Sequence, residues 1–105
     1  MDFDDYQEWT RSTAIYPRES ALEYTVLGLV SEAGEVAGKV KKIIRDGDDG
    51  PLRDAAIAEL GDVLWYLARV ADELGVELSA IAVENHYKLE SRKSRGVIGG
   101  SGDNR

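Results

Sequence analysis

Two long segments with helical periodicity, joined by only five residues, are the feature that most constrains how this chain can fold. Apolar side chains recur at helical spacing from residue 20 to 45 and again from 51 to 74, and DGDDG at 46–50 separates the two segments. Pro51 is well placed to open the second helix, and Gly75 to cap its end. Because the connection is short, the two helices are predicted to be antiparallel neighbours.

The remaining segments contain nothing that alternates like a β-strand. A first helix is expected over residues 3–15, where Tyr16-Pro17 stops it, and a last one over 79–93. The C-terminal segment GVIGGSGDNR has four glycines in ten residues and no helical character. We therefore predict an all-α fold, with an antiparallel bundle of four to five helices over residues 1–95 and a flexible Gly-rich tail at 96–105.

Composition excludes several classes of site and partner. The 105 residues suffice for one domain, they include no cysteine and a single histidine, His86, and the net charge is −7. Disulfides, thiolate catalysis, Cys-based metal sites and all-histidine metal sites are therefore excluded. With 13 basic against 20 acidic residues, there is no basic surplus for stable binding to nucleic acid or to an anionic membrane.

Localisation and assembly are inferred from the same features. No apolar run approaches the roughly 20 residues that cross a bilayer, and the acidic N-terminus MDFDDYQEW does not resemble a signal peptide, so a cytoplasmic protein is expected. A chain this small buries only about 60–70% of its unfolded surface. We expect another copy of the chain to cover part of its apolar surface, in a homodimer or homotetramer.

Four acidic residues in two pairs carry the main functional signal. Glu32 and Glu35 lie three residues apart in the first long helix, as do Glu59 and Asp62 in the second, so each pair shares one helix face. Both faces are apolar, and acidic groups there are unfavourable unless something compensates their charge. Counting about 1.5 Å of rise per residue from the connecting loop places the two pairs within roughly one helical turn of each other.

Four converging carboxylates would repel one another and would have raised pKa values. Hard divalent cations relieve that repulsion, and Mg²⁺, with Mn²⁺ as a substitute, favours oxygen ligands beside substrate phosphates. A single E-x-x-E pair is usually a solvated helix face, whereas two pairs on apolar faces at matching heights favour a metal site. Gly34, Gly38 and Gly61 adjoin the carboxylates, which indicates either close helix packing or room for a ligand.

Basic and polar residues near these pairs have two interpretations each. Lys39, four residues after Glu35, is either an ion-pair partner on the same helix or a phosphate contact. Asn85, Lys88 and Arg92 share one face of the last helix, where a solvated surface is the ordinary expectation and a phosphate-binding face is the functional one.

On these residues the chain resembles the MazG-like all-α nucleoside triphosphate pyrophosphohydrolases, whose superfamily includes dimeric dUTPases and phosphoribosyl-ATP pyrophosphatases. The segments LGLVSEAGEVAGKVKK and IAELGDVLWYLARVADELGVEL are similar to the two metal-binding helices of that family. NHYKLESRKSRG is similar to the following helix, and GSGDNR to the tail of a small, single-domain subgroup. The resemblance covers most of the chain. The two carboxylate pairs together are specific for this family, whereas either pair alone is not.

The resemblance implies Mg²⁺-dependent hydrolysis of nucleoside or deoxynucleoside triphosphates between the α- and β-phosphates. The products are a monophosphate and pyrophosphate, and the role is house-cleaning of the nucleotide pool. The resemblance also implies the metal ligands, namely Glu32, Glu35, Glu59 and Asp62. The attacking water needs a base, and a carboxylate at the metal site, either Glu32 or Glu35, is the candidate. The positions expected to contact the triphosphate are Lys39, Asn85, Lys88, Arg92 and Arg95.

The same resemblance extends to the tail. Its glycines permit close approach to phosphate, and Ser101, Asp103, Asn104 and Arg105 offer polar contacts. We expect residues 96–105 to be mobile in the free protein and to become ordered over a bound nucleotide, in the same subunit or in a neighbouring one.

Other functions compete with this interpretation. A specific dUTP or dCTP pyrophosphatase, or a phosphoribosyl-ATP pyrophosphatase, is the nearest enzymatic rival. A non-catalytic helical module that binds a partner protein or nucleotide is a rival of another class, although such a module gains nothing from four acids on apolar faces. A di-iron carboxylate bundle needs E-x-x-H pairs, and this chain has none.

Overall fold

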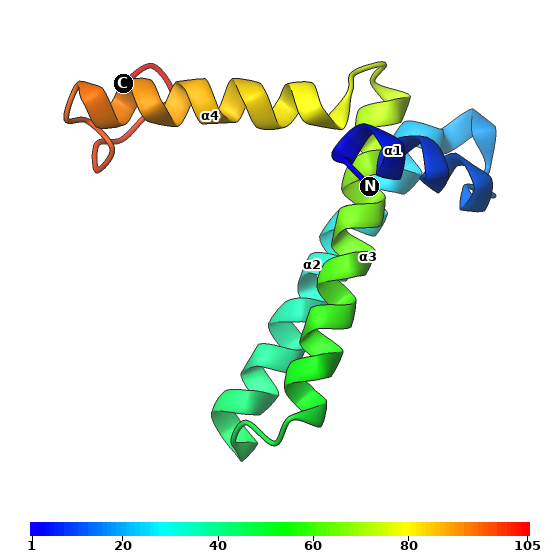
Figure 1. Ribbon diagram of the computed structural model, residues 1–105. Helices are drawn as coiled ribbons and strands as arrows, with labels where there is room; N and C mark the ends of the chain where they lie inside the picture. Colours follow the sequence, from blue (N-terminus) through cyan, green and yellow to red (C-terminus); the bar gives the residue numbers. More distant parts are fainter.

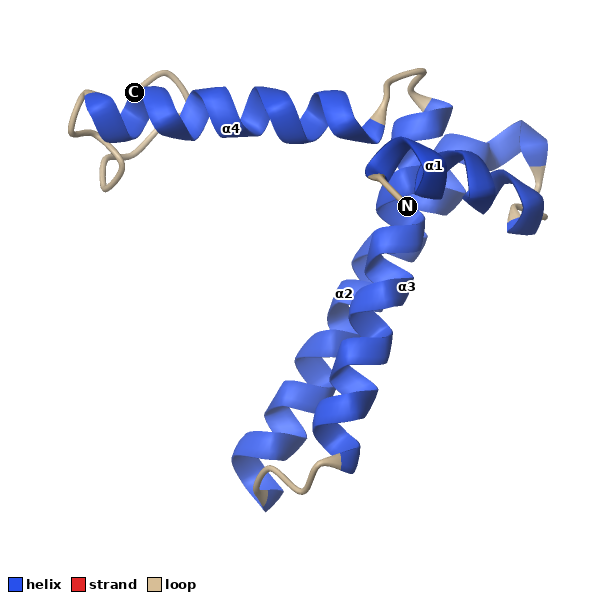
Figure 2. Cartoon of the chain, viewed as in Figure 1, coloured by secondary structure: helices blue, strands red, loops and turns tan.

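Two antiparallel helices, α2 (Ala21–Asp46) and α3 (Pro51–Glu73), form a long hairpin (Figure 1). The computed structural model describes residues 1–105 and contains only helices, turns and loops (Figure 2). A short helix, α1 (Phe3–Thr10), crosses one end of the hairpin, and α4 (Leu78–Ser94) starts at that end and extends away to one side. The all-α class that the sequence predicted is confirmed.

Most helix ends lie within a residue or two of their predicted positions, and the first helix is the exception. It ends at Thr10, not at residue 15, and a 3₁₀ turn, η1 (Arg11–Thr13), follows. The hydroxyl groups of Thr10 and Thr13 donate to the carbonyl oxygens of Gln7 and Thr10, three residues back. These bonds compete with regular helical pairing. A second 3₁₀ turn, η2 (Arg18–Ser20), then leads into α2.

Close packing of α2 on α3 depends on Gly28. A Cβ atom added at Gly28 would collide with the ring carbons of Tyr66 on α3, so only glycine lets the ring lie against the α2 backbone. By contrast, a Cβ atom at Gly34, Gly38 or Gly61 would meet nothing within 4 Å. Close packing within one chain therefore does not explain the three glycines that the sequence singled out, and the space beside the carboxylates is open.

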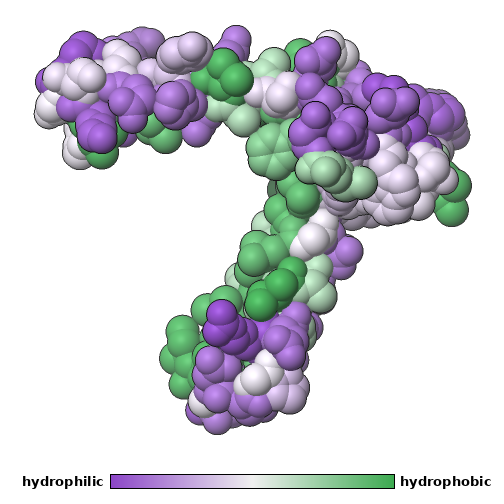
Figure 3. Space-filling view, in the orientation of Figure 1, coloured by the Kyte–Doolittle hydropathy of each residue, from purple (hydrophilic) through white to green (hydrophobic).

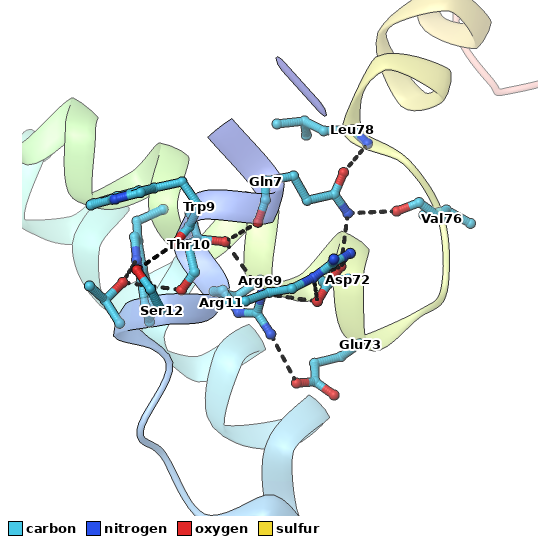
Figure 4. A network of polar contacts seen from close by, with 12 residues as sticks. Gln7, Trp9, Thr10, Arg11, Ser12, Arg69, Asp72, Glu73, Val76 and Leu78 are labelled. Atoms are coloured by element: carbon cyan, nitrogen blue, oxygen red, sulfur yellow. Dashed lines mark hydrogen bonds and ion pairs between the residues drawn. The ribbon is translucent and has the colours of Figure 1, made fainter. Parts of the chain in front are cut away.

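A buried arginine ties α1 to the end of the hairpin. The side chain of Arg69 on α3 donates to the Tyr16 hydroxyl at 3.1 Å and to the Thr10 hydroxyl at 3.3 Å. It also pairs with Asp72 at 3.0 Å, and Asp72 in turn accepts from Arg11 (Figure 4). Because Arg69 is only 3% exposed, its charge needs these partners. The network keeps the N-terminal segment fixed on α3.

Gln7 sets where α4 begins. Its side-chain amide donates to the Val76 carbonyl oxygen at 2.8 Å, and the Leu78 backbone N–H donates to the Gln7 side-chain oxygen at 2.7 Å (Figure 4). Asp4 accepts from the backbone N–H and the hydroxyl of Ser79 at the first turn of α4. Helix α1 thereby holds the α3–α4 connection in the direction that sends α4 away from the hairpin.

An unusually large share of the apolar surface is exposed. Only 10 of 105 residues are buried, and the chain exposes 7248 Å², about 1,400 Å² more than the roughly 5,800 Å² expected for a folded chain of its mass. Leu27 on α2 and Tyr87 on α4 are each 69% exposed, and apolar side chains run along the hairpin in Figure 3. No helix combines the length and the hydropathy that a membrane span requires.

We predict that Gly28→Ala destabilises the protein while Gly34→Ala does not. The new methyl group at position 28 must displace the Tyr66 ring, which typically costs about 1–3 kcal/mol. At position 34 the methyl group meets open space and gains up to about 1 kcal/mol of helix propensity. Urea unfolding of both variants measures the difference, and equal stabilities would contradict the packing role of Gly28.

Candidate metal centre

Three carboxylates from the two hairpin helices meet at one place. Glu32 comes from the middle of α2, and Glu59 and Asp62 come from facing positions on α3, one helical turn apart. One oxygen atom of each carboxylate lies within 4.8 Å of the others. We call these three residues the acidic cluster. Its donor set, three carboxylate oxygens, suits a hard divalent cation such as Mg²⁺.

Glu35, the fourth predicted ligand, lies outside the acidic cluster. It is three residues nearer the α2–α3 loop than Glu32, and its side chain is 56% exposed. The structure therefore brings together three of the four carboxylates that the sequence paired. Glu32 and Glu59 are half-buried, whereas Asp62 is exposed, so only part of the cluster lies in the apolar surroundings that the helical pattern predicted.

Like charges and partial burial oppose ionisation in the acidic cluster. Burial raises the pKa of Glu32, and the neighbouring carboxylates of Glu59 and Asp62 raise it further. A raised pKa means that the Glu32 charge is less favourable in the folded chain than in the unfolded one. Its contribution to stability therefore falls as the pH rises above the ordinary value of 4.5. A bound cation would reverse this effect.

Lys39 reaches both sides of the site. Its ammonium nitrogen lies 3.9 Å from a carboxylate oxygen of Glu35 on the same helix and 3.9 Å from one of Glu59 on α3. The sequence predicted the first contact as an i,i+4 pair, but the second depends on how α2 packs against α3. Lys39 forms the only ion pairs that the four acidic residues make in the chain.

Two tyrosines next to the acidic cluster, Tyr66 and Tyr6, are not among the site residues predicted from the sequence, although the sequence allows Tyr66 to flank a base as well as to lie in the core. The pKa of the Tyr66 hydroxyl is raised, chiefly by burial and also by Tyr24, Glu32 and Asp62. The pKa of Tyr6 on α1 is raised by burial and by Asp62. The sequence could have indicated that Tyr66 lies beside the site, because it follows Asp62 by one helical turn. For Tyr6, no spacing within the sequence relates it to α3.

The predicted phosphate-binding residues of α4 lie apart from the acidic cluster. Asn85 and Lys88 are exposed on α4, which extends away from the hairpin in Figure 1. Arg92 is buried and donates to the Asp103 carbonyl oxygen at 2.9 Å. Within one chain, none of these three residues joins the carboxylates.

The tail folds back onto the end of α4. The Arg95 side chain donates to the Ser91 hydroxyl and to the carbonyl oxygen of Arg105. The Arg105 side chain donates to backbone carbonyl oxygens within the tail, including that of Val97 at 3.0 Å. Ser101 and the Asp103 carboxylate form no hydrogen bond or ion pair with the rest of the chain. Ordering of the tail over a nucleotide stays a prediction.

Comparisons with known proteins identify a matching family model and several relatives. The model of the MazG nucleotide pyrophosphohydrolase domain matches residues 20–97, which include α2, α3 and α4 but not α1. The chain is 52% identical to the Gene 37 protein of Mycobacterium phage L5 over the full length of both proteins. It is also 34% identical over 82 residues to an aspartate–tRNA(Asp/Asn) ligase of Bifidobacterium longum, covering 78% of this chain and 12% of the ligase.

No solved structure is a significant match to the chain. The family model nevertheless covers well over half of its length, and the matched segment contains both carboxylate pairs and the helix that follows them. The chain therefore belongs to the family of the MazG nucleotide pyrophosphohydrolase domain.

Proposed function

We propose that this protein is a Mg²⁺-dependent nucleoside triphosphate pyrophosphohydrolase that cleaves between the α- and β-phosphates and releases pyrophosphate. The observation that carries the proposal is the acidic cluster, in which Glu32, Glu59 and Asp62 bring oxygens within 4.8 Å of one another. Membership of the MazG family supports the same reaction. Clearing unwanted nucleotides from the cytoplasmic pool is the role that suits such an activity.

Glu32, Glu59 and Asp62 would hold the cation. Mg²⁺ bound there supplies charge neutralisation of the triphosphate and lowers the pKa of a coordinated water. The raised pKa of Glu32 supports this assignment, because a site that repels its own charges is built to accept a cation. Mn²⁺ accepts the same oxygen ligands and is expected to substitute.

Glu35 is our candidate for the general base. It lies outside the acidic cluster and is more than half exposed, so its carboxylate oxygens are available to a water molecule. The base must take a proton from the water that attacks the α-phosphorus, as the bond to the pyrophosphate oxygen breaks. The leaving pyrophosphate is highly charged, and a nearby cationic side chain such as Lys39 would stabilise it.

Product analysis with a panel of nucleoside triphosphates tests the proposal. We expect pyrophosphate and a nucleoside monophosphate in the presence of Mg²⁺ or Mn²⁺, and no turnover in chelator. Glu35→Gln should lower kcat by at least about 100-fold, as removal of a general base does, while the variant still binds Mn²⁺, because the acidic cluster stays intact. Release of orthophosphate would point to another hydrolase, and no turnover of any nucleotide would favour the binding module.

We predict opposite effects of Asp62→Asn on metal binding and on stability. Loss of one ligand should weaken Mn²⁺ binding at least about tenfold, whereas loss of one charge relieves the repulsion on Glu32 and raises the melting temperature measured in chelator. Glu19→Gln, which removes an exposed charge remote from the cluster, serves as the control. If Asp62→Asn melts at or below the wild-type temperature in chelator, this result would argue against convergence of the three carboxylates.

The exposed surface supports assembly into a homo-oligomer. The excess of about 1,400 Å² exceeds the roughly 800 Å² that each partner buries in a standard interface. The radius of gyration, 16.6 Å, is also larger than the roughly 13 Å typical of a compact chain of this length. A second copy is the occupant we propose for the apolar faces of the hairpin and α4, because each copy exposes both faces.

Assembly would also complete the site. Helix α4 carries Asn85 and Lys88 on an exposed face, and its last turn is basic, which is complementary to the acidic cluster. We propose that α4 of a second copy brings these two residues to the carboxylates, since α4 of the same chain extends away from them (Figure 1). This arrangement places each site between two subunits.

Mixing two inactive variants tests the shared site. Glu59→Gln damages the cluster and Lys88→Met damages α4, so a mixed dimer would hold one site with both defects and one site with neither. After co-refolding, about a quarter of the wild-type activity should return, since half of the dimers are mixed and each has one intact site. A mixture that stays inactive, or light scattering from an 11.5 kDa monomer at micromolar concentration, would contradict the proposal.

A further inference from the structure

Lys39 bridges the two helices at the edge of the acidic cluster. It starts from α2, and its ammonium nitrogen lies 3.9 Å from an oxygen of Glu35 on α2 and 3.9 Å from one of Glu59 on α3. The Lys39 side chain is only 23% exposed, although lysine usually extends into solvent. It therefore lies along the hairpin, with its charge directed at the acids.

No other cation shares this position. Lys41 and Lys42, on the same helix, are exposed and form no ion pair with a carboxylate, and Arg45 pairs with Asp46 beside the loop. Lys39 is thus the one counter-ion of the four acidic residues. Its ammonium group lies between Glu35, which is outside the acidic cluster, and Glu59, which belongs to it.

Glu59 belongs to two sets of contacts. One of its oxygens lies within 4.8 Å of the Glu32 and Asp62 carboxylates, and one lies 3.9 Å from the Lys39 ammonium nitrogen. A divalent cation held by Glu59 would repel the Lys39 ammonium group beside the same carboxylate, because like charges close together interact strongly in a half-buried site. The divalent cation and the Lys39 ammonium group therefore compete for the Glu59 carboxylate.

We propose that Lys39 is a built-in competitor for the metal: it neutralises Glu35 and Glu59 until a divalent cation enters, and its displacement lowers the affinity of the site. The inference rests on the proposed metal site and adds to it a residue that tunes metal binding. Once displaced, Lys39 keeps a flexible four-carbon stem and an ammonium group suited to phosphate, so the same residue can turn from the carboxylates to an incoming triphosphate.

The experiment measures Mn²⁺ affinity calorimetrically, without nucleotide, in full-length Lys39→Met, Lys39→Gln, Lys39→Arg and the control Lys41→Met. Lys41→Met removes one charge from the same helix, so it reports the effect of net charge alone. We expect Lys39→Met and Lys39→Gln to bind Mn²⁺ at least about fivefold more tightly, Lys41→Met to change the affinity less than about twofold, and Lys39→Arg to stay near wild type.

A second readout is the melting temperature in chelator. Lys39→Met should melt below wild type because its carboxylates lack their counter-ion, and it should gain more from added Mn²⁺ than wild type does. The glutamine variant provides the same test if the methionine variant fails to fold. Unchanged or weaker Mn²⁺ binding in the folded neutral variants would overturn the proposal.

Glu59→Gln separates this failure from failure of the proposed function. If wild type and Glu59→Gln bind Mn²⁺ equally, the acidic cluster is not a metal site, and the role of Lys39 falls with it. If Glu59→Gln loses Mn²⁺ while the neutral Lys39 variants bind it no more tightly than wild type, the metal site stands and only the competition by Lys39 is refuted.

Discussion

The contact between Gly28 and the Tyr66 ring is the constraint on which the site depends. At Gly28, the absence of a side chain lets the Tyr66 ring of α3 lie against the α2 backbone. This contact lies one turn before Glu32 on α2 and one turn after Asp62 on α3, and it is compatible with the register in which Glu32 faces Glu59 and Asp62. A shift of one residue along either helix would turn a carboxylate out of the cluster, since neighbouring helix positions point about 100° apart.

The second constraint is the buried charge of Arg69. Its partners come from α1, from the segment before α2 and from α3, so the folded position of each segment depends on the others. Gln7 extends this arrangement to the α3–α4 connection and sends α4 away from its own hairpin. The contacts of Arg69 and Gln7 thereby fix one end of the hairpin, and they leave α4 and one long face of the α2–α3 hairpin without a partner in the same chain.

Charge is balanced differently at the end of α3 and in its middle. At Asp72 and Glu73, arginines lower the carboxyl pKa values, so these pairs stabilise the fold above the ordinary values of 3.8 and 4.5 and lose that effect as the pH falls. At the acidic cluster, burial and the neighbouring carboxylates of Glu59 and Asp62 shift the pKa of Glu32 in the opposite direction, upward. The carboxylates at the end of α3 are paired within their own chain, whereas those in its middle are suited to an external cation.

The helices and the two carboxylate pairs could be predicted from the sequence because they depend on local spacing. Periodicity predicted α2, α3 and α4 within two residues at each end, and three-residue spacing placed Glu59 beside Asp62 on one face. The early end of α1 was missed, because hydroxyl groups at Thr10 and Thr13 bond back to the backbone in competition with helical pairing.

Only tertiary structure decided which residues meet across helices. Spacing could not tell that Glu32 and not Glu35 joins the pair on α3, that Lys39 reaches Glu59, or that the packing glycine is Gly28. Each of these contacts depends on the rotation and translation of one helix against another, which is set by side-chain packing over the whole hairpin. The sequence by itself determined the helices and the chemistry of their faces; the direction of α4 and the membership of the acidic cluster were decided by how those faces pack.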